Sequence, residues 1–272
     1  MANPNIPRRQ FLACALGGLS ASVVSACGLT GLGGIALWAT RRDTGAPSTR
    51  PALNLATLPP PENLPMVRRA DWGALAPDHS ARFENGFYDA ERNPAGWRVY
   101  DQPLADVYRT VVIHHSVEEE ADDLATLAFI QNLHRGDRGW ADVAYHYFIG
   151  KAGTLYEGRP LTVRGVHVGG HNTGSAGVCL LGNFMHQQPT PAQLDAARGL
   201  VVWLAGFLQL THLAGHRAFN AGTLCPGDNL VPHLPGLATA AGLALGPDGY
   251  DGPTPQPSDT PRANGPGCAC HT

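Results

Sequence analysis

The chain has 272 residues, of which 43% are hydrophobic, and this length suits one large globular domain or two small ones. Its formal net charge is only −3, and the absence of a basic excess argues against a nucleic-acid-binding protein. The 12 histidines stand out, because imidazole is the commonest metal ligand and a frequent proton carrier.

An apolar leader is predicted for residues 1–42. Arg8 and Arg9 precede a stretch rich in Gly, Ala and Ser, and this pattern resembles a twin-arginine (Tat) export signal. The stretch is about long enough to cross a bilayer, which takes roughly 20 apolar residues. It fits a cleaved export signal, a lipid anchor at Cys27 or an uncleaved membrane helix. Each alternative places the rest of the chain outside the cytoplasm, in the periplasm, cell envelope or medium.

Two segments without globular character border the predicted domain, which covers residues 66–245. Residues 43–65 carry six prolines and are predicted to form an extended, semi-rigid linker. Residues 246–272 are rich in Gly and Pro and are predicted to be a disordered tail. Cys268 and Cys270 near its end could bind a metal or form a disulfide, but a frayed end without function is favoured. We expect a monomer.

Strand and helix patterns alternate within residues 66–245. Apolar, β-branched runs and a Gly-rich turn predict strands over 110–113, 143–149, 154–157 and 177–181. Helical spacing predicts helices over 118–134, 190–208 and 230–243. The second of these helices begins with Thr190 and Pro191, a typical cap and first-turn pair, and Pro235 could interrupt the third. The mixture of hairpins and helices predicts an α/β or α+β fold with a mixed sheet flanked by helices.

The chain contains a candidate set of zinc ligands. The buried strand over 110–113 ends in His114-His115, and His216 precedes Cys225 by nine positions in a run that favours a loop. Two imidazoles and one thiolate suit a catalytic zinc, which keeps its fourth position open for water. Taken alone, His216 and Cys225 are more simply interpreted as a surface histidine beside a buried cysteine.

Six motifs, in this order, together resemble the peptidoglycan recognition protein family. They are 69–74 (RADWGA), 112–116 (VIHHS), 142–147 (DVAYHY), 156–160 (YEGRP), 177–184 (GVCLLGNF) and 215–227 (GHRAFNAGTLCPG). That family is similar to the phage amidase lysozymes, which have the type-2 N-acetylmuramoyl-L-alanine amidase fold. The resemblance spans about residues 66–235. It implies a central mixed sheet flanked by helices in a single domain, with a zinc at one end of a groove.

The resemblance also implies residue roles. His114, His216 and Cys225 match the family's three zinc ligands. Tyr145 matches a tyrosine that faces the zinc, although its alternative is a core aromatic. Thr223 stands where some phage relatives carry a lysine, and its neutral hydroxyl would stabilise an oxyanion less strongly. The remaining histidines near these motifs are interpreted as structural: His115, His134, His146 and His212.

The resemblance further implies four substrate-binding residues. His167 and Asn172 belong to a loop that lines the groove, with His167 nearest the metal, and a solvated turn is an equal alternative for Asn172. Trp140 and Arg159 are expected to contact substrate, with a core position as the alternative for Trp140. Cys179 stands where another branch of amidases places a glutamate base, so this chain lacks that base.

The implied function is a zinc-dependent N-acetylmuramoyl-L-alanine amidase, which cleaves peptidoglycan between the muramyl lactyl group and L-alanine. The alternative is a non-catalytic peptidoglycan-binding receptor on the same fold. Such receptors typically lack a ligand, often the cysteine, whereas Cys225 is present here. The expected partner is therefore a muropeptide. The sequence does not indicate whether its third residue is lysine or diaminopimelate, or what purpose the cut serves.

Overall fold

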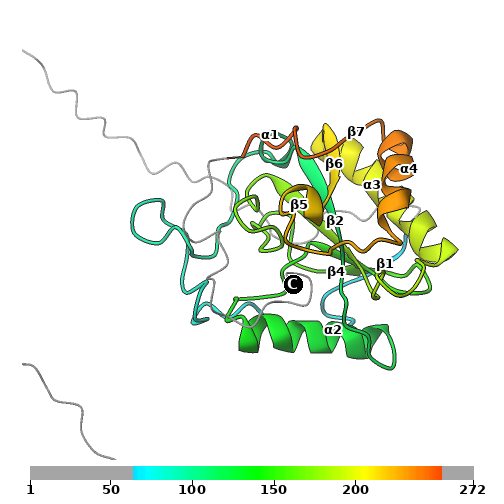
Figure 1. Ribbon diagram of the computed structural model, residues 1–272. Coiled ribbons are helices and arrows are strands. Elements are labelled where there is room, and N and C mark those ends of the chain that lie inside the picture. Colours follow the sequence, from blue (N-terminus) through cyan, green and yellow to red (C-terminus); the bar gives the residue numbers. More distant parts are fainter. Residues whose placement is uncertain (1–63, 253–272) are drawn as a thin grey trace, which may run out of the picture. The chain divides into compact units, whose positions relative to one another are not determined.

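The computed structural model describes residues 64–252, drawn in colour in Figure 1. The predicted leader over 1–42, most of the linker, and Cys268 and Cys270 lie outside the described residues. Within the described part of the chain, no helix combines the length and apolar character needed to cross a membrane.

A seven-stranded sheet organises the described residues, in the order β1-β4-β3-β5-β2-β6-β7. The strands are β1 (Met66–Val67), β2 (Thr110–His115), β3 (Tyr147–Ile149), β4 (Leu155–Glu157), β5 (Ser175–Leu180), β6 (His212–Gly215) and β7 (Ala244–Leu245). Strands β3 and β4 form an antiparallel hairpin, and the other pairs over residues 64–252 are parallel. The prediction of a mixed sheet is therefore confirmed.

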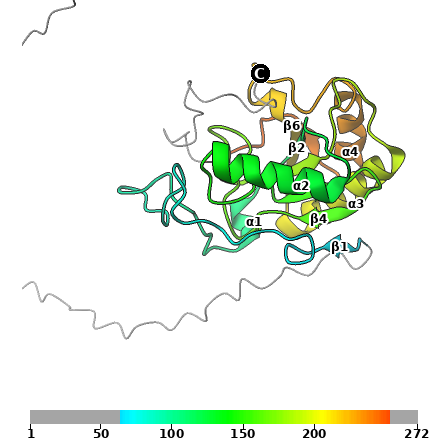
Figure 2. The ribbon, with the colours of Figure 1, turned by 90° about the horizontal axis from the view of Figure 1, so that it is seen from below.

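Helices cover both faces of this sheet (Figures 1 and 2). One face is covered by α2 (Asp123–Asn132), which continues into the π-helical turn η1 (Leu133–Asp137). The other is covered by α3 (Pro191–Leu208) and α4 (Leu234–Ala240). The short elements are α1 (Leu104–Val107), η2 (His216–Ala218) and η3 (Val231–His233). The predicted α/β class, with helices flanking a central sheet, is confirmed.

Strand β2 lies inside the sheet, and all six of its residues are buried. Because side chains alternate along a strand, Val111 and Ile113 join the apolar core under α3 and α4. His114 points to the opposite face, toward the cluster that Leu127 and Ile130 of α2 form with Tyr145. The two neighbouring histidines at the end of β2 therefore face different layers of the protein.

Strand register brings residues with reactive side chains together at the carboxyl ends of three neighbouring strands, β5, β2 and β6. His114 of β2 lies beside Cys179 of β5, and Ile113 lies beside Gly215, the last residue of β6. Because β2 and β6 are parallel, His216 emerges from β6 close to His114. The carboxyl ends of parallel strands are the usual place for a functional site in such sheets.

Several element boundaries differ from the prediction. Helix α2 begins at Asp123 instead of residue 118, because the Asp122 side chain accepts a hydrogen bond from the Ala125 N–H at 2.8 Å and caps the helix. Tyr145 lies in the segment just before β3 and not within the strand. Pro235 lies in the first turn of α4, where proline is tolerated. The described chain continues to Gly252, beyond the predicted end of the domain at residue 245.

Candidate metal centre

His114, His216 and Cys225 come together at the carboxyl ends of β2 and β6. One possible ligand atom from each side chain lies within 4.8 Å of the other two, and all three residues are buried. His114 belongs to β2, and His216 opens the turn η2 directly after β6. The loop that follows η2 returns Cys225 to the same place. This is the one group of three or more His, Cys, Asp or Glu side chains within residues 64–252 that is arranged to hold a metal ion.

The spacing of one pair of donor atoms fits a tetrahedral zinc ion. His114 Nδ1 and Cys225 Sγ are 3.5 Å apart. Zinc bonds of about 2.05 Å to nitrogen and about 2.3 Å to sulfur would separate the two atoms by about 3.6 Å at a tetrahedral angle. Three protein ligands leave one corner of the tetrahedron for water or substrate, as in catalytic zinc sites; structural sites usually have four protein ligands.

The loop that carries Cys225 is held by hydrogen bonds to its own backbone. Thr223 Oγ1 accepts from the Cys225 N–H at 3.1 Å, and the Cys225 carbonyl accepts from the Arg217 N–H at 3.0 Å. Arg217 also forms an ion pair with Asp228 at 2.7 Å. Thr223 itself is buried, two residues before Cys225 in the chain. A hydroxyl that accepts one hydrogen bond still has its own hydrogen to donate.

Tyr145 lies beside the cluster. Its ring centroid is 5.0 Å from that of His114 and 5.8 Å from that of His134. The segment before β3 is anchored there, because the Tyr145 carbonyl accepts from the Arg159 N–H at 2.8 Å. Trp140 is partly exposed and packs on His134, with ring centroids 5.0 Å apart. Trp140 is thus joined to Tyr145 through the ring of His134.

His167 and Asn172 are more deeply buried than a groove-lining loop would require. His167 is 3% exposed, and its Nδ1 lies 3.1 Å from Nε2 of His114. Burial lowers the pKa of His167 to about 3, so its ring is neutral at physiological pH. Asn172 Oδ1 accepts from the backbone N–H groups of His167 and Val168, at 2.7 and 2.8 Å. Asn172 is therefore not a solvated turn residue but a brace for the loop.

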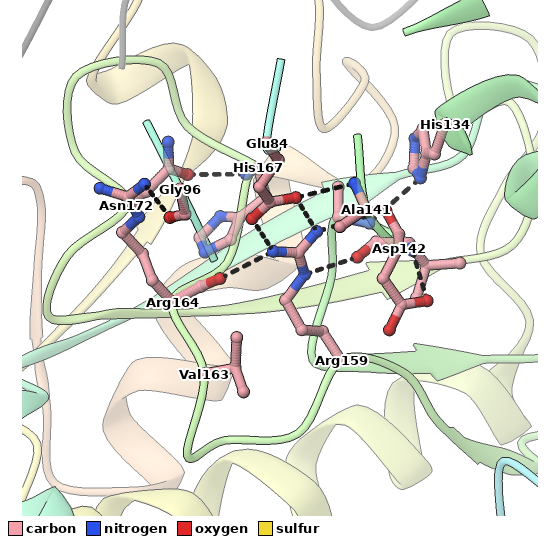
Figure 3. Close-up of polar contacts among 12 residues, drawn as sticks. Glu84, Gly96, His134, Ala141, Asp142, Arg159, Val163, Arg164, His167 and Asn172 are labelled. Carbon is pink, nitrogen blue, oxygen red and sulfur yellow. Dashed lines mark hydrogen bonds and ion pairs between the residues drawn. The ribbon is translucent and has the colours of Figure 1, made fainter. Parts of the chain in front are cut away.

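The prediction that Arg159 contacts substrate is wrong, because its guanidinium is fully buried in an ion pair with Glu84 (Figure 3). Arg159 Nη1 and Nη2 donate to the two carboxylate oxygens of Glu84 at 2.5 and 3.0 Å. Arg159 Nε also donates to the Val143 carbonyl at 2.9 Å. Glu84 was not predicted as a partner of Arg159. A buried arginine requires a counter-charge, and that requirement is the one signal in the sequence that points to an acidic partner.

Four further histidines lie outside the ligand cluster, as predicted. His115 Nδ1 accepts from the Phe184 N–H at 3.3 Å, and His146 Nδ1 accepts from the Gly177 N–H at 2.9 Å. Burial lowers the pKa of both rings to about 4. Each imidazole therefore accepts a hydrogen bond from a buried backbone N–H, a role that a backbone carbonyl usually fills. His134 Nδ1 accepts from the Ala144 N–H, and His212 lies on β6 beside Thr211.

Comparison with known proteins finds one family throughout. A family model described as N-acetylmuramoyl-L-alanine amidase matches residues 104–228. Peptidoglycan-recognition protein SD of Drosophila simulans is 34% identical over 173 residues, which cover 61% of this chain and 82% of that protein. Peptidoglycan recognition protein 1 of Bos indicus is 34% identical over 169 residues, covering 61% and 80% of the two chains.

Solved structures give the same result. The structure of wild-type Drosophila PGRP-LB is similar, with a TM-score of 0.52 and 26% identity, over 70% of this chain and 99% of that one. A mutant of Drosophila PGRP-LB in complex with tracheal cytotoxin has a TM-score of 0.51 and 26% identity, over 66% and 96% of the two chains. The mixed sheet and its flanking helices are thus a shared fold.

Proposed function

The chain belongs to the family of peptidoglycan recognition proteins and type-2 N-acetylmuramoyl-L-alanine amidases, and on that premise we propose that it is a zinc-dependent amidase. It hydrolyses the amide bond between the muramyl lactyl group and the L-alanine of a peptidoglycan stem peptide. One observation carries the proposal: His114, His216 and Cys225 lie buried together, with ligand atoms within 4.8 Å of one another. A protein that only binds peptidoglycan has no need of two imidazoles and a thiol gathered in one buried cluster.

When bound, zinc supplies Lewis acidity, which polarises the amide carbonyl and lowers the pKa of water toward about 7. The protein's own side chains supply the rest. Tyr145 lies beside His114, where its neutral phenol orients the attacking water or donates to the reacting carbonyl. Thr223 offers a neutral donor to the developing oxyanion, two residues from Cys225. The products are a glycan ending in lactate and a stem peptide with a free L-alanine amine.

A peptidoglycan fragment as substrate is supported by the structure of peptidoglycan recognition protein-LE, which was solved with tracheal cytotoxin, a monomeric diaminopimelic acid-type peptidoglycan. Trp140 is our candidate for substrate contact, because it is partly exposed and joined to Tyr145 through His134. We also propose that the leader over 1–42 exports the domain, since peptidoglycan lies outside the cytoplasmic membrane. The linker over 43–65 then separates the leader from the amidase domain.

Mass spectrometry of muropeptides tests the proposal. Purified peptidoglycan is digested with the full-length protein, with and without a chelator, and then with zinc restored. Intact stem peptides and lactyl-ended glycan should appear with zinc and vanish with the chelator. Protein that sediments with peptidoglycan in the presence of zinc but releases no stem peptide would instead indicate a receptor of the same fold.

A further inference from the structure

A chain of three polar contacts leads from the backbone of β5 to the candidate metal centre. The Ser175 carbonyl oxygen lies 3.2 Å from Nε2 of His167. Nδ1 of His167 lies 3.1 Å from Nε2 of His114. Nδ1 of His114, on the far side of that ring, lies 3.5 Å from Sγ of Cys225. Two imidazole rings therefore connect a backbone carbonyl to the thiol.

The first contact determines the direction of the others. A backbone carbonyl can only accept a hydrogen bond, so Nε2 of His167 must donate to Ser175. A neutral imidazole carries one N–H, which makes Nδ1 of His167 an acceptor. His114 must then donate to it from Nε2. This leaves the lone pair of His114 Nδ1 directed toward Cys225, and that nitrogen is the one a shared metal would bind.

The ring of His167 is held in this position from several sides. A Cβ atom added to Gly165 would lie 2.5 Å from Cδ2 of His167, and one added to Gly177 would lie 2.7 Å from it. The backbone at both positions thus packs against the imidazole. The backbone beneath the ring is fixed as well, because the backbone N–H of His167 donates to Asn172 Oδ1 at 2.7 Å. With 3% of its surface exposed, His167 has little area left for a substrate to touch.

We propose that His167 is a positioning residue, which fixes His114 in the Nε2–H tautomer and so directs His114 Nδ1 to the metal. This proposal rests on the proposed function only for the identity of the metal, because the tautomer of His114 is already set in the metal-free protein. Metal-bound histidines commonly donate their second nitrogen to a carboxylate or carbonyl, and loss of that partner typically weakens metal binding roughly 10–100-fold. Here a second histidine, oriented by Ser175, takes that place.

The first test reads the tautomer of His114 by nitrogen-15 NMR of the ring in the metal-free, full-length protein. The wild type should carry its proton on Nε2. His167→Leu removes the acceptor and should leave a mixture of tautomers. His167→Gln should retain the wild-type tautomer, because its amide can donate to Ser175 and accept from His114. A proton on Nδ1 in the wild type, or an unchanged tautomer in His167→Leu, would overturn the proposal.

The second test measures the dissociation constant for zinc by competition with a chelator. His167→Leu should weaken zinc binding by about 10–100-fold, and His167→Gln should restore most of it. Gln193→Leu is the control, since it removes another buried hydrogen bond, from Gln193 Nε2 to the Leu181 carbonyl at 2.8 Å, on the face of the sheet that α3 covers. Wild-type affinity in His167→Leu, or an equal loss in Gln193→Leu, would show that His167 has no specific role. A wild-type protein that bound no zinc would refute the proposed function, and the tautomer would still decide the role of His167.

Discussion

Replacing Glu84 by glutamine is expected to destabilise the domain by about 3–5 kcal/mol, because the change leaves the Arg159 guanidinium buried without a counter-charge. Glu84 and Arg159 have side chains that are 3% and 0% exposed. Glutamine keeps the shape of the side chain but removes its charge. It also turns one of the two acceptor atoms into an NH₂ group that faces the donors of Arg159.

The contacts explain why this magnitude belongs to the upper range for a single substitution. Glu84 accepts from both terminal nitrogens of Arg159, at 2.5 and 3.0 Å, and its Oε2 also accepts from the Ala141 N–H at 3.0 Å. In a domain of this size, each kcal/mol lowers the melting temperature by about 2–4 °C. The expected decrease is therefore roughly 6–20 °C.

Urea unfolding followed by tryptophan fluorescence gives the free energy of unfolding. The matched control is Asp195→Asn, which removes the charge from an exposed ion pair, with Asp195 Oδ1 2.9 Å from Arg198 Nη1. That pair should contribute less than about 1 kcal/mol, since exposed charges are well solvated whether or not they are paired. The reasoning is refuted if Glu84→Gln loses no more stability than Asp195→Asn.

Three further predictions concern the site and its pH dependence. Cys225→Ser should lower zinc content and activity by more than the roughly 10–100-fold of an outer-shell loss, and full turnover by this variant would contradict its role as a ligand. Tyr145→Phe should reduce kcat by about 100-fold with zinc retained, and an unchanged rate would remove the phenol from the mechanism. His146 has a folded-state pKa of about 4, below its ordinary 6.5, so below pH 6.5 the unfolded chain binds the extra proton. Because His146 stays neutral in the folded protein, the free energy of unfolding should fall by about 2 kcal/mol as the pH is lowered from 7 to 5. Urea unfolding at several pH values measures this change. If His146→Gln shows the same dependence of the unfolding free energy on pH as the wild type, other groups cause the loss.

The sequence by itself determined the elements that depend on local signals. The apolar run at the start of β2 predicts a buried strand wherever the chain places it. Thr190 and Gln193 form the capping box of α3 from residues three positions apart, with Thr190 Oγ1 accepting from the Gln193 N–H at 3.0 Å. The six motifs identified the family, and the structure brings together the three ligands that the resemblance names, with His216 and Cys225 in one short loop.

Only the tertiary structure decided which partners meet across long distances in the chain. Arg159 was interpreted as a substrate contact because its motif gives no sign of Glu84, which lies 75 positions away. His167 was predicted to line the substrate groove, and its burial could not be predicted because it depends on how distant segments pack. Its contact with His114 spans 53 positions of the chain. Local residue patterns record backbone preferences and apolar faces. Pairing of buried polar groups depends on how segments that are distant in the chain pack against one another, and this is decided only when the sheet and its loops assemble.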